Sequence, residues 1–345
     1  MAAVRIADAP LAALNTFGIA ATARVLWRVE SAADVPQVVR ALRDEAGGAP
    51  LVLGGGSNLL LTGDLERPVL QVAIRGRRVV SDEGGSIVVE AGAGEPWDPL
   101  VHWTLAQGAA GLENLALIPG TAGAAPIQNI GAYGVEQRDT FDSLDAVDLT
   151  DGTARRFDAA DCAFGYRDSV FKGPDGGRWL VVAVRWRLSR TPRLALDYGE
   201  VRDELARAGV AAPGPIDVAD AVSAIRRRKL PDPATLGNAG SFFKNPLVPA
   251  ALADALRARE PGLPAWPAGE RVKLSAAWMI DRCGWKGHRD GDAGVHAAHA
   301  LVLVNHGAAT GAQLLALARR IRDSVRTRFG VELEPEPVIA GPATL

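Results

Sequence analysis

The sequence predicts a fold of the α+β class that is divided into more than one domain. The chain has 345 residues, more than one ordinary domain holds, which suggests two or three domains. Apolar segments of strand length and segments of helical periodicity are mixed along the chain. The strand at residues 51–53 runs through a glycine turn into another apolar strand, whereas in a Rossmann domain it would run into a helix.

The first part of the chain predicts two helices among short strands. A helix over residues 31–46 begins at Ser31, with Asp34 three residues later, and Gly47 and Gly48 end it. Its apolar side chains at helical spacing are Val35, Val38, Val39 and Leu42. A second helix is expected over residues 96–107, with Pro96 near its first turn. Strands are expected over residues 51–53, 59–61, 69–74 and 86–91.

The later part of the chain predicts a hairpin, a boundary and a series of helices. Asp151 and Gly152 form a strong hairpin signal between strands at residues 144–149 and 154–157. A proline-rich stretch at residues 189–215 follows the strand over 179–188 and marks a domain boundary or an insertion. A strand is expected over 300–304, and helices over 217–228, 250–259, 275–283 and 311–329, the last one stopped by Gly330.

Composition limits the class of protein. The net charge of −2 gives no reason to expect nucleic acid as a partner. Cys162 and Cys283 are the only cysteines and form no CxxC pattern, which argues against a disulfide framework and a zinc knuckle and fits a reducing cytoplasm. We find no secretory signal and no apolar segment that could cross a bilayer. We therefore expect a soluble cytoplasmic protein with no membrane partner.

Residues 119–134 are the most informative segment. They combine glycines, prolines and alanines with no charged side chain, so we expect neither a helix nor an ordinary strand there. Glycine lets a ligand approach backbone N–H groups, so the segment predicts a preformed cradle for a large, flat, partly anionic ligand such as a dinucleotide. The alternative is a tight buried loop of small residues. The polar side chains of the segment are Thr121, Gln128, Asn129 and Tyr133.

A second glycine turn joins the strands at 51–53 and 59–61. It contains Gly54, Gly55, Gly56, Ser57 and Asn58. Because a strand and not a helix follows, binding here would use backbone amides and the Ser57 and Asn58 side chains, not a helix dipole.

Three polar constellations lie in glycine-rich or apolar surroundings, at residues 165–169, 237–246 and 332–336. Their candidate side chains are Arg167, Ser241 and Glu336, and Pro335 could aim Glu336 out of a terminal strand. Each also has an ordinary explanation, respectively a surface anchor, a cap and a solvated carboxylate. His296 and His299 have a spacing that can chelate a metal, but no acidic motif accompanies them, so we expect structural or substrate-edge roles and no metal.

Taken together and in this order, these motifs resemble the UDP-N-acetylenolpyruvoylglucosamine reductase family, over nearly the whole chain. The segments that carry the resemblance are residues 15–18, 55–58, 119–136, 165–169, 229–233, 237–246 and 333–336. The 119–136 loop and the Gly-Ser-Phe-Phe-Lys-Asn-Pro run at 240–246 are highly specific. Residues 197–199 are similar to the tyrosine-bearing loop of the longer subclass of the family, which folds over the sugar nucleotide.

The resemblance implies a domain plan and a reaction. It implies a two-subdomain FAD-binding domain of the vanillyl-alcohol-oxidase type at residues 1–190, dividing near residue 75. A linker with the Tyr198 loop follows at 191–215, and an α+β substrate-binding domain at 216–345, whose last strand returns toward the flavin. NADPH would reduce a non-covalently bound FAD, which would then reduce the enolpyruvyl ether of UDP-N-acetylglucosamine to UDP-N-acetylmuramate for peptidoglycan synthesis. We expect a monomer.

The resemblance also assigns residues. Arg167 would stabilise the substrate carboxylate, Ser241 would protonate the α-carbon, and Glu336, with a raised pKa, would donate to the enolate. Substrate contacts would come from Tyr166, Tyr198, Lys229 and Asn245. FAD would be held by Gly54, Gly55, Gly56, Ser57, Asn58, Leu59, Pro119, Gly120, Thr121, Gly123, Ala125, Pro126, Gln128, Asn129, Gly131, Ala132, Tyr133 and Gly134.

One departure and two alternatives remain. His299 stands where the family commonly has Gln, which puts a nucleotide contact there in doubt. An alcohol or lactone oxidase of the same FAD superfamily is one alternative, although residues 53–58 contain no histidine for a covalent flavin. A non-catalytic nucleotide-sugar sensor is the other.

Overall fold

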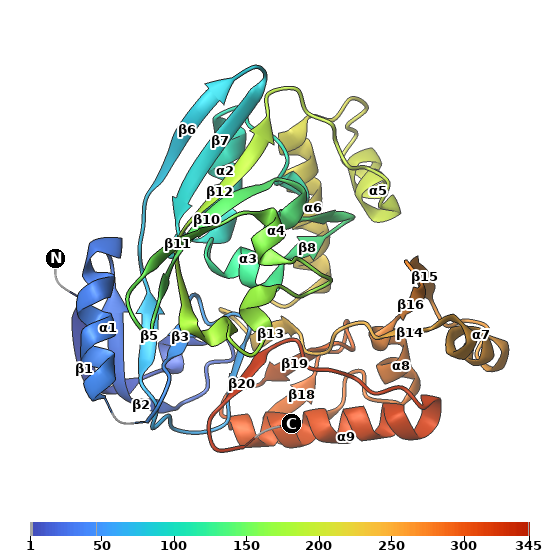
Figure 1. Ribbon diagram of the computed structural model, residues 1–345. Coiled ribbons are helices and arrows are strands. Elements are labelled where there is room, and N and C mark those ends of the chain that lie inside the picture. The colour runs from blue at the N-terminus through green and yellow to red at the C-terminus, as the bar shows by residue number, and fades with distance from the viewer. Residues whose placement is uncertain (1–2, 46, 344) are drawn as a thin grey trace. The chain divides into compact units, whose positions relative to one another are not determined.

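Figure 1 shows the protein as a computed structural model that describes residues 3–45, 47–343 and 345. The contacts among these residues form two compact units. The first comprises the described residues of Met1–Ala9, Ala23–Gly56 and Glu66–Arg228, and the second those of Pro10–Thr22, Ser57–Leu65 and Lys229–Leu345. The linker expected at 191–215 therefore lies inside the first unit, where Val201, Leu205 and Val222 join the hydrophobic core. The assignment of cofactor and substrate domains stays a prediction.

A sheet in the order β1-β2-β5-β3 begins the first unit, with β5 parallel to both β2 and β3. Helix α1 lies along it (Figure 1), and Ser31 caps the short turn η2 before the helix by accepting from the Ala33 N–H. The four predicted apolar positions of α1 are all buried, which confirms the periodicity. The helix ends at Asp44 because Glu45 is extended; Ala46, its predicted end, lies outside the described residues. The elements are β1 (Val4–Pro10), β2 (Thr22–Val29), η2 (Ala32–Asp34), α1 (Val35–Asp44), β3 (Leu51–Leu53) and β5 (Val69–Val72).

An antiparallel sheet in the order β11-β10-β12-β7-β6 forms the rest of the core of this unit. The predicted hairpin is confirmed, since β10 pairs with β11 on either side of Asp151 and Gly152. Helices α2 and α6 bury Trp97, Leu100 and Ile225 in the same core. The elements are β6 (Arg77–Glu83), β7 (Ser86–Gly92), α2 (Trp97–Ala106), β10 (Phe141–Asp148), β11 (Ala154–Phe157), α4 (Ala159–Cys162), β12 (Trp179–Ser189), α5 (Gly199–Arg207) and α6 (Pro215–Lys229).

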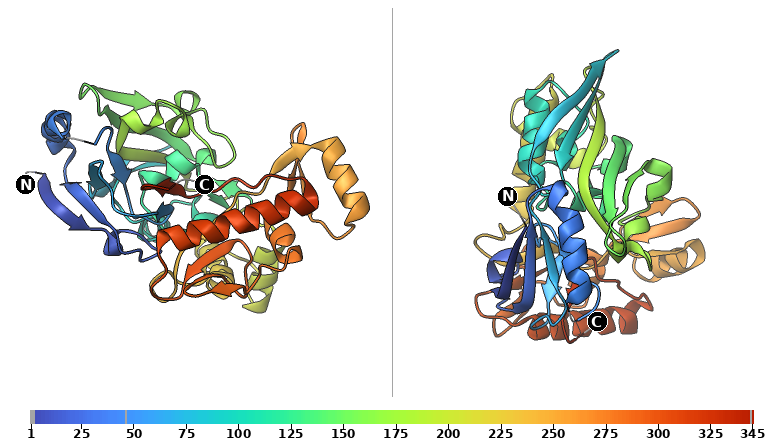
Figure 2. Two further views of the ribbon diagram at one scale, coloured as in Figure 1. Left: turned by 90° about the horizontal axis from the view of Figure 1, so that it is seen from below. Right: turned by 60° about the vertical axis from the view of Figure 1, so that its left-hand side comes forward.

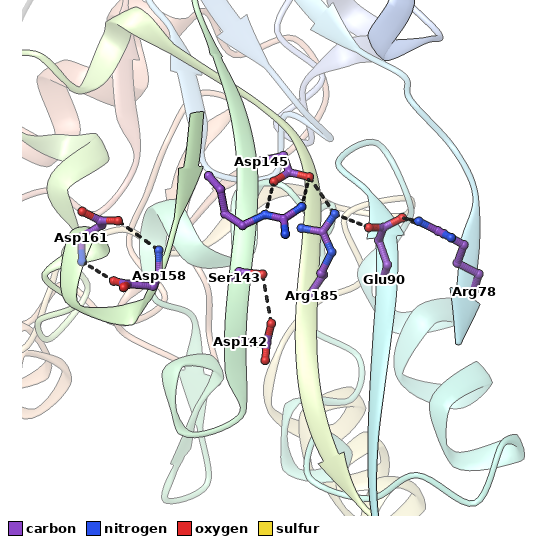
Figure 3. Close-up of polar contacts among 9 residues, drawn as sticks. Arg78, Glu90, Asp142, Ser143, Asp145, Asp158, Asp161 and Arg185 are labelled. Carbon is purple, nitrogen blue, oxygen red and sulfur yellow. Dashed lines mark hydrogen bonds and ion pairs between the residues drawn. The ribbon is translucent and has the colours of Figure 1, made fainter. Parts of the chain in front are cut away.

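Charged side chains form a ladder across this sheet (Figure 3). Arg185 on β12 is 9% exposed and pairs with Asp145 on β10 at 2.7 Å and with Glu90 on β7. Arg78 on β6 donates to Glu90 at 2.8 Å, and Arg156 on β11 donates to Asp145 at 2.8 Å. Each charge faces an opposite charge on the neighbouring strand, so the ladder helps to set the register of the sheet.

Asp145→Asn should destabilise the protein by about 1–3 kcal/mol at pH 7, because it leaves the buried Arg185 with Glu90 alone. Burial acts to raise the pKa of Asp145, but hydrogen bonds from Arg156 and Arg185 outweigh it and lower the pKa from 3.8 to about 2. Because the pKa of Asp145 is lower in the folded protein, its ionised carboxylate stabilises the fold at pH values above the unfolded pKa of 3.8. This stabilisation is lost as the pH falls toward 2. Urea unfolding of both proteins from pH 7 downward measures the difference.

The matched control is Asp290→Asn, whose carboxylate pairs with Arg320 at an exposed site. It should change the free energy of unfolding much less than Asp145→Asn does. A difference between wild type and Asp145→Asn that stays constant below pH 4 would contradict the ladder as its cause.

The second unit is built on an antiparallel sheet in the order β13-β19-β18-β17. Helix α9 contacts β18 and β19, and α8 contacts α9. Helix α9 spans the predicted residues and ends at Gly330, whose φ of 69° is the left-handed conformation that glycine adopts without strain. The elements are β13 (Gly237–Ser241), α8 (Ala276–Arg282), β17 (Arg289–Asp290), β18 (Ala293–Val295), β19 (Val302–Asn305) and α9 (Gly311–Phe329).

Two smaller sheets complete this unit. The sheet β14-β16-β15 carries helix α7, and both views in Figure 2 show them at one end of α9. Strand β20 pairs in parallel with β4, so residues 338–340 lie beside the strand that follows the glycine turn at residues 54–58. The elements are β4 (Leu59–Leu61), β14 (Leu247–Pro249), α7 (Ala250–Arg259), β15 (Ala265–Ala268), β16 (Arg271–Leu274) and β20 (Val338–Ala340).

Both cysteines are free thiols. Burial raises the pKa of Cys162 to about 12, so this thiol is protonated and unreactive at neutral pH. Within the described ranges, no helix combines the length and the apolar composition needed to cross a membrane.

Candidate active site

The two glycine-rich segments meet in the first unit. A Cβ on Gly54 would lie 2.7 Å from Thr121 Oγ1, and one on Gly55 would lie 3.3 Å from Gly120 Cα. Gly56 and Gly120 have φ of 64° and 126°, which favour glycine. Side chains larger than hydrogen at Gly54 and Gly55 would push the two turns apart, so the close approach of the turns requires glycine at these positions.

The expectation that residues 119–134 contain no helix is wrong. Residues Ala124–Gln128 form the short helix α3, and Asn129 ends it with a left-handed φ of 40°. Pro126 is tolerated because it lies in the first turn, where the missing N–H has no helical partner. Strands β8 (Gly131–Ala132) and β9 (Val135–Glu136) follow as a hairpin whose two turn residues, Tyr133 and Gly134, both have positive φ.

Asn129 connects α3 to the segment that carries Arg167. Its side chain is fully buried, and Nδ2 donates to the Gly165 carbonyl at 2.8 Å and to Glu136 Oε2 at 3.0 Å. The neighbouring Gln128 accepts from Lys172 Nζ at 3.2 Å. The side chains of Gln128 and Asn129, two predicted cofactor residues, thus form hydrogen bonds with other residues of the protein.

Arg167 lies in a tight turn between Gly165 and Asp168 with a φ of 53°, a strained value for arginine. One guanidinium nitrogen donates to the Gly131 carbonyl at 2.6 Å, and Lys172 Nζ donates to the Arg167 carbonyl at 2.9 Å. The guanidinium is therefore oriented by the β8–β9 hairpin of the predicted cofactor loop.

Tyr133 and Tyr198 are in contact in the first unit, with ring centres 5.4 Å apart and ring planes at 82°. Arg226 on α6 hydrogen-bonds the Tyr133 side chain and donates to the Leu117 carbonyl at 3.1 Å. Burial lowers the pKa of Arg226; Tyr133 acts in the opposite direction, and the charge of Arg167 adds to the lowering. In the sequence Arg226 is one of three consecutive arginines and belongs to no motif, although Val222 four residues earlier indicated a buried face.

Ser241, Glu336 and Asn58 come together in the second unit. The Glu336 N–H donates to the Phe242 carbonyl at 2.8 Å, next to Ser241 at the end of β13. Asn58 Nδ2 donates to the Glu336 carbonyl at 3.1 Å. Glu336 precedes β20 and does not follow a terminal strand, because Pro335 pairs with Phe243 before the last strand begins. Two predicted catalytic residues and one predicted cofactor residue thus lie on adjacent segments.

The predicted substrate contacts Lys229 and Asn245 also lie in the second unit. So does His299, which stands where the family commonly has Gln. Asn245 Oδ1 accepts from the Ala276 N–H at 3.0 Å, at the start of α8. His299 Nδ1 accepts from the Leu301 N–H at 3.3 Å, and burial followed by the Lys229 charge lowers the pKa of His299. In the part of the chain that the structure describes, no three His, Cys, Asp or Glu side chains form a metal-binding group.

Comparisons with known proteins match the chain to an FAD-binding domain and to a reductase C-terminal domain. A family model described as "FAD binding domain" matches residues 23–158, and one described as "UDP-N-acetylenolpyruvoylglucosamine reductase, C-terminal domain" matches residues 232–340. The chain is 61% identical to UDP-N-acetylenolpyruvoylglucosamine reductase of Pseudomonas aeruginosa, over 94% of this chain and 95% of the relative. It is 60% identical to the reductase of Burkholderia ambifaria, over 96% and 95%.

A solved structure is similar over the whole length. The crystal structure of UDP-N-acetylenolpyruvylglucosamine reductase from Thermus caldophilus matches with a TM-score of 0.66 and 28% identity, covering 98% of this chain and 99% of that one. The similarity therefore extends to the fold of both units.

Proposed function

The chain belongs to the UDP-N-acetylenolpyruvoylglucosamine reductase family, and from this premise we propose how its own residues carry out the family reaction. The reaction is the NADPH-dependent reduction of UDP-N-acetylglucosamine enolpyruvate to UDP-N-acetylmuramate through FAD, in peptidoglycan precursor synthesis. The observation that carries this conclusion is the 61% identity over 94% of the chain. It favours the reductase over an oxidase or a non-catalytic binder.

The glycine turns fit a flavin dinucleotide. Gly123 approaches Ala93 so closely that a Cβ would lie 2.6 Å from the Ala93 Cβ, as Gly54 does with Thr121. At such glycines no side chain covers the backbone, so a large flat ligand can approach it closely. We propose that the predicted cofactor residues in 54–59 and 119–134 hold FAD. When bound, FAD supplies the redox chemistry by accepting two electrons from NADPH and delivering them as a hydride to the substrate double bond.

Arg167 is proposed to hold the substrate carboxylate. Hydride addition at the terminal carbon moves negative charge onto the α-carbon and the carboxylate, so a fixed cation there stabilises the transition state more than the ground state. A guanidinium carries five N–H donors, so its bond to Gly131 is compatible with a two-point contact to a carboxylate. The strained turn and the hairpin contact fix its orientation before the substrate arrives.

Ser241 is proposed to give its hydroxyl proton to the α-carbon, and Glu336 to donate a hydrogen bond to the developing enolate. A serine is a weak acid, but the carbanion-like centre is a strong base, and a neutral donor adds no competing charge. The Glu336 carboxyl would have to be protonated for its role. The hydrogen bond from the Glu336 N–H to the Phe242 carbonyl holds the segment of Glu336 next to that of Ser241, which supports the proposal that both residues act on the same substrate.

The sugar nucleotide is proposed to contact Tyr166, Tyr198, Lys229 and Asn245. Tyr198 is 48% exposed and would stack on the ligand, while Lys229 would pair with phosphate. The bond from Ala276 to Asn245 Oδ1 orients the amide, so that Nδ2 would be the donor to the ligand. We further propose that the enzyme is a cytoplasmic monomer, which fits its two free thiols.

A flavin titration tests this function. The purified protein should be yellow, lose its colour with NADPH under nitrogen and regain it when UDP-N-acetylglucosamine enolpyruvate is added. Recovery of colour only with oxygen would indicate an oxidase, and a flavin that NADPH does not bleach would indicate a binding protein.

A further inference from the structure

Asn114 joins two loops that are far apart in the sequence. It lies in the turn η3 (Glu113–Leu115) and is 1% exposed. Its Nδ2 donates to the Tyr133 carbonyl at 3.1 Å and to the Ala195 carbonyl at 2.9 Å. A side-chain amide has two N–H donors, so each carbonyl can receive one of them.

The two loops are proposed to contact different ligands, FAD and the sugar nucleotide. Tyr133 belongs to the proposed flavin segment 119–134, and Ala195 belongs to the tyrosine loop, defined here as residues 191–198, which ends at Tyr198. The rings of Tyr133 and Tyr198 touch edge to face. Tyr133 lies in the turn of the β8–β9 hairpin and its side chain also interacts with Arg226, so we take Tyr133 as the support and the tyrosine loop as the part that Asn114 positions against it.

Much of the tyrosine loop is exposed, although Leu194 and Leu196 pack against the hydrophobic core. Tyr198 remains 48% exposed despite its contact with Tyr133, and residues 191–193 and 197–199 are exposed. Asn114, itself buried, gives this exposed segment one hydrogen bond, to the Ala195 carbonyl, and ties it through a second one to the Tyr133 carbonyl. A loop that is already ordered loses less conformational entropy when a ligand binds beneath it.

We propose that Asn114 is a positioning residue that docks the tyrosine loop on the flavin segment and thereby sets the affinity for the sugar nucleotide. The inference rests on the proposed function, because it takes Tyr198 as a substrate contact. Asn114 touches neither substrate nor flavin in this proposal; it acts through the backbone of residues 133 and 195.

Asn114→Asp tests the attachment. The carboxylate has the same shape but cannot donate, and it faces two carbonyl oxygens. We expect the KM for UDP-N-acetylglucosamine enolpyruvate to rise about 10- to 100-fold, as for two lost hydrogen bonds, while kcat changes less than about threefold. The rate of flavin bleaching by NADPH without sugar nucleotide should stay within about twofold. Steady-state kinetics and anaerobic stopped-flow absorbance measure these quantities.

A matched control separates positioning from general destabilisation. Asn15 is also buried and donates to two carbonyls, those of Leu11 at 2.8 Å and Ile19 at 3.0 Å, within the second unit. Asn15→Asp should lower Tm without raising the KM for the sugar nucleotide. An equal rise in KM in both variants would overturn the proposal.

A double-mutant cycle keeps the test open if Asn114→Asp does not fold. Asn114→Ala introduces no charge, and its effect on KM should nearly vanish in a Tyr198→Leu background, because Tyr198 is the group that Asn114 positions. Independent, multiplying effects on KM would overturn the inference. A wild-type protein that does not turn over would refute the proposed function itself, whereas normal turnover with an unchanged KM in both Asn114 variants would refute only the role of Asn114.

Discussion

Ser241→Ala is expected to leave flavin bleaching by NADPH nearly unchanged and to slow the reduction of the enolpyruvyl substrate by about 10²–10⁴-fold. The hydroxyl is proposed to act only after the hydride has been transferred, so the first half-reaction does not need it. A range of 10²–10⁴ is the usual contribution of a positioned general acid. Anaerobic stopped-flow absorbance of the flavin measures the two half-reactions separately.

Ser223→Ala is the matched control for this prediction. The Ser223 hydroxyl is buried on α6 and has no hydrogen-bond partner among the residues that the structure describes, so its removal should change neither half-reaction. Equal slowing of both half-reactions by Ser241→Ala would contradict the role of Ser241 as proton donor and would indicate a defect in flavin binding.

Arg167→Lys is expected to lower kcat/KM for the sugar nucleotide by about 10²–10³-fold, a loss of the size seen when one preorganised transition-state donor is removed. Lysine keeps the charge but lacks the planar fork that contacts a carboxylate at two points. It also loses the guanidinium geometry that bonds to the Gly131 carbonyl. We expect kcat to fall with kcat/KM, because the interaction strengthens as charge develops in the transition state. Steady-state kinetics at varied substrate concentration measures both constants.

Arg155→Lys controls for the general effect of exchanging arginine for lysine, because Arg155 pairs with Asp161 at a more exposed site on β11. It should leave kcat/KM within about twofold. A rise in KM alone for Arg167→Lys would show that Arg167 binds the substrate without stabilising the transition state. Loss of bound flavin in Arg167→Lys would instead point to its contact with the β8–β9 hairpin.

Much of the local structure could be predicted because its signals lie within a few residues. The spacing of Val35, Val38, Val39 and Leu42 predicted the buried face of α1, and Gly330 predicted the end of α9. These features depend on backbone conformation and one apolar face, which neighbouring residues determine. Family membership was also evident, because the glycine segments and the 240–246 run are specific enough to be recognised in a single sequence.

Other features depend on partners that are distant in the sequence. The short helix Ala124–Gln128 was not predicted, because its C-terminal end is held by Asn129, whose side chain bonds to the distant Gly165 carbonyl. Asn114 carried no motif and became interpretable only through the carbonyls of Tyr133 and Ala195. The pairing of β4 with β20 likewise joins segments from opposite ends of the chain.

The sequence by itself determined the family, the reaction, the β10–β11 hairpin and most helix positions, because these depend on short motifs and on periodicity. Only the tertiary structure decided that Glu336 is held by Asn58 and Phe242, that Arg167 is oriented by Gly131, and that Asn114 joins two loops. The physical reason is that a hydrogen bond or a close backbone approach requires positions within a few ångströms, and for residues far apart in the chain only the packed fold defines those positions.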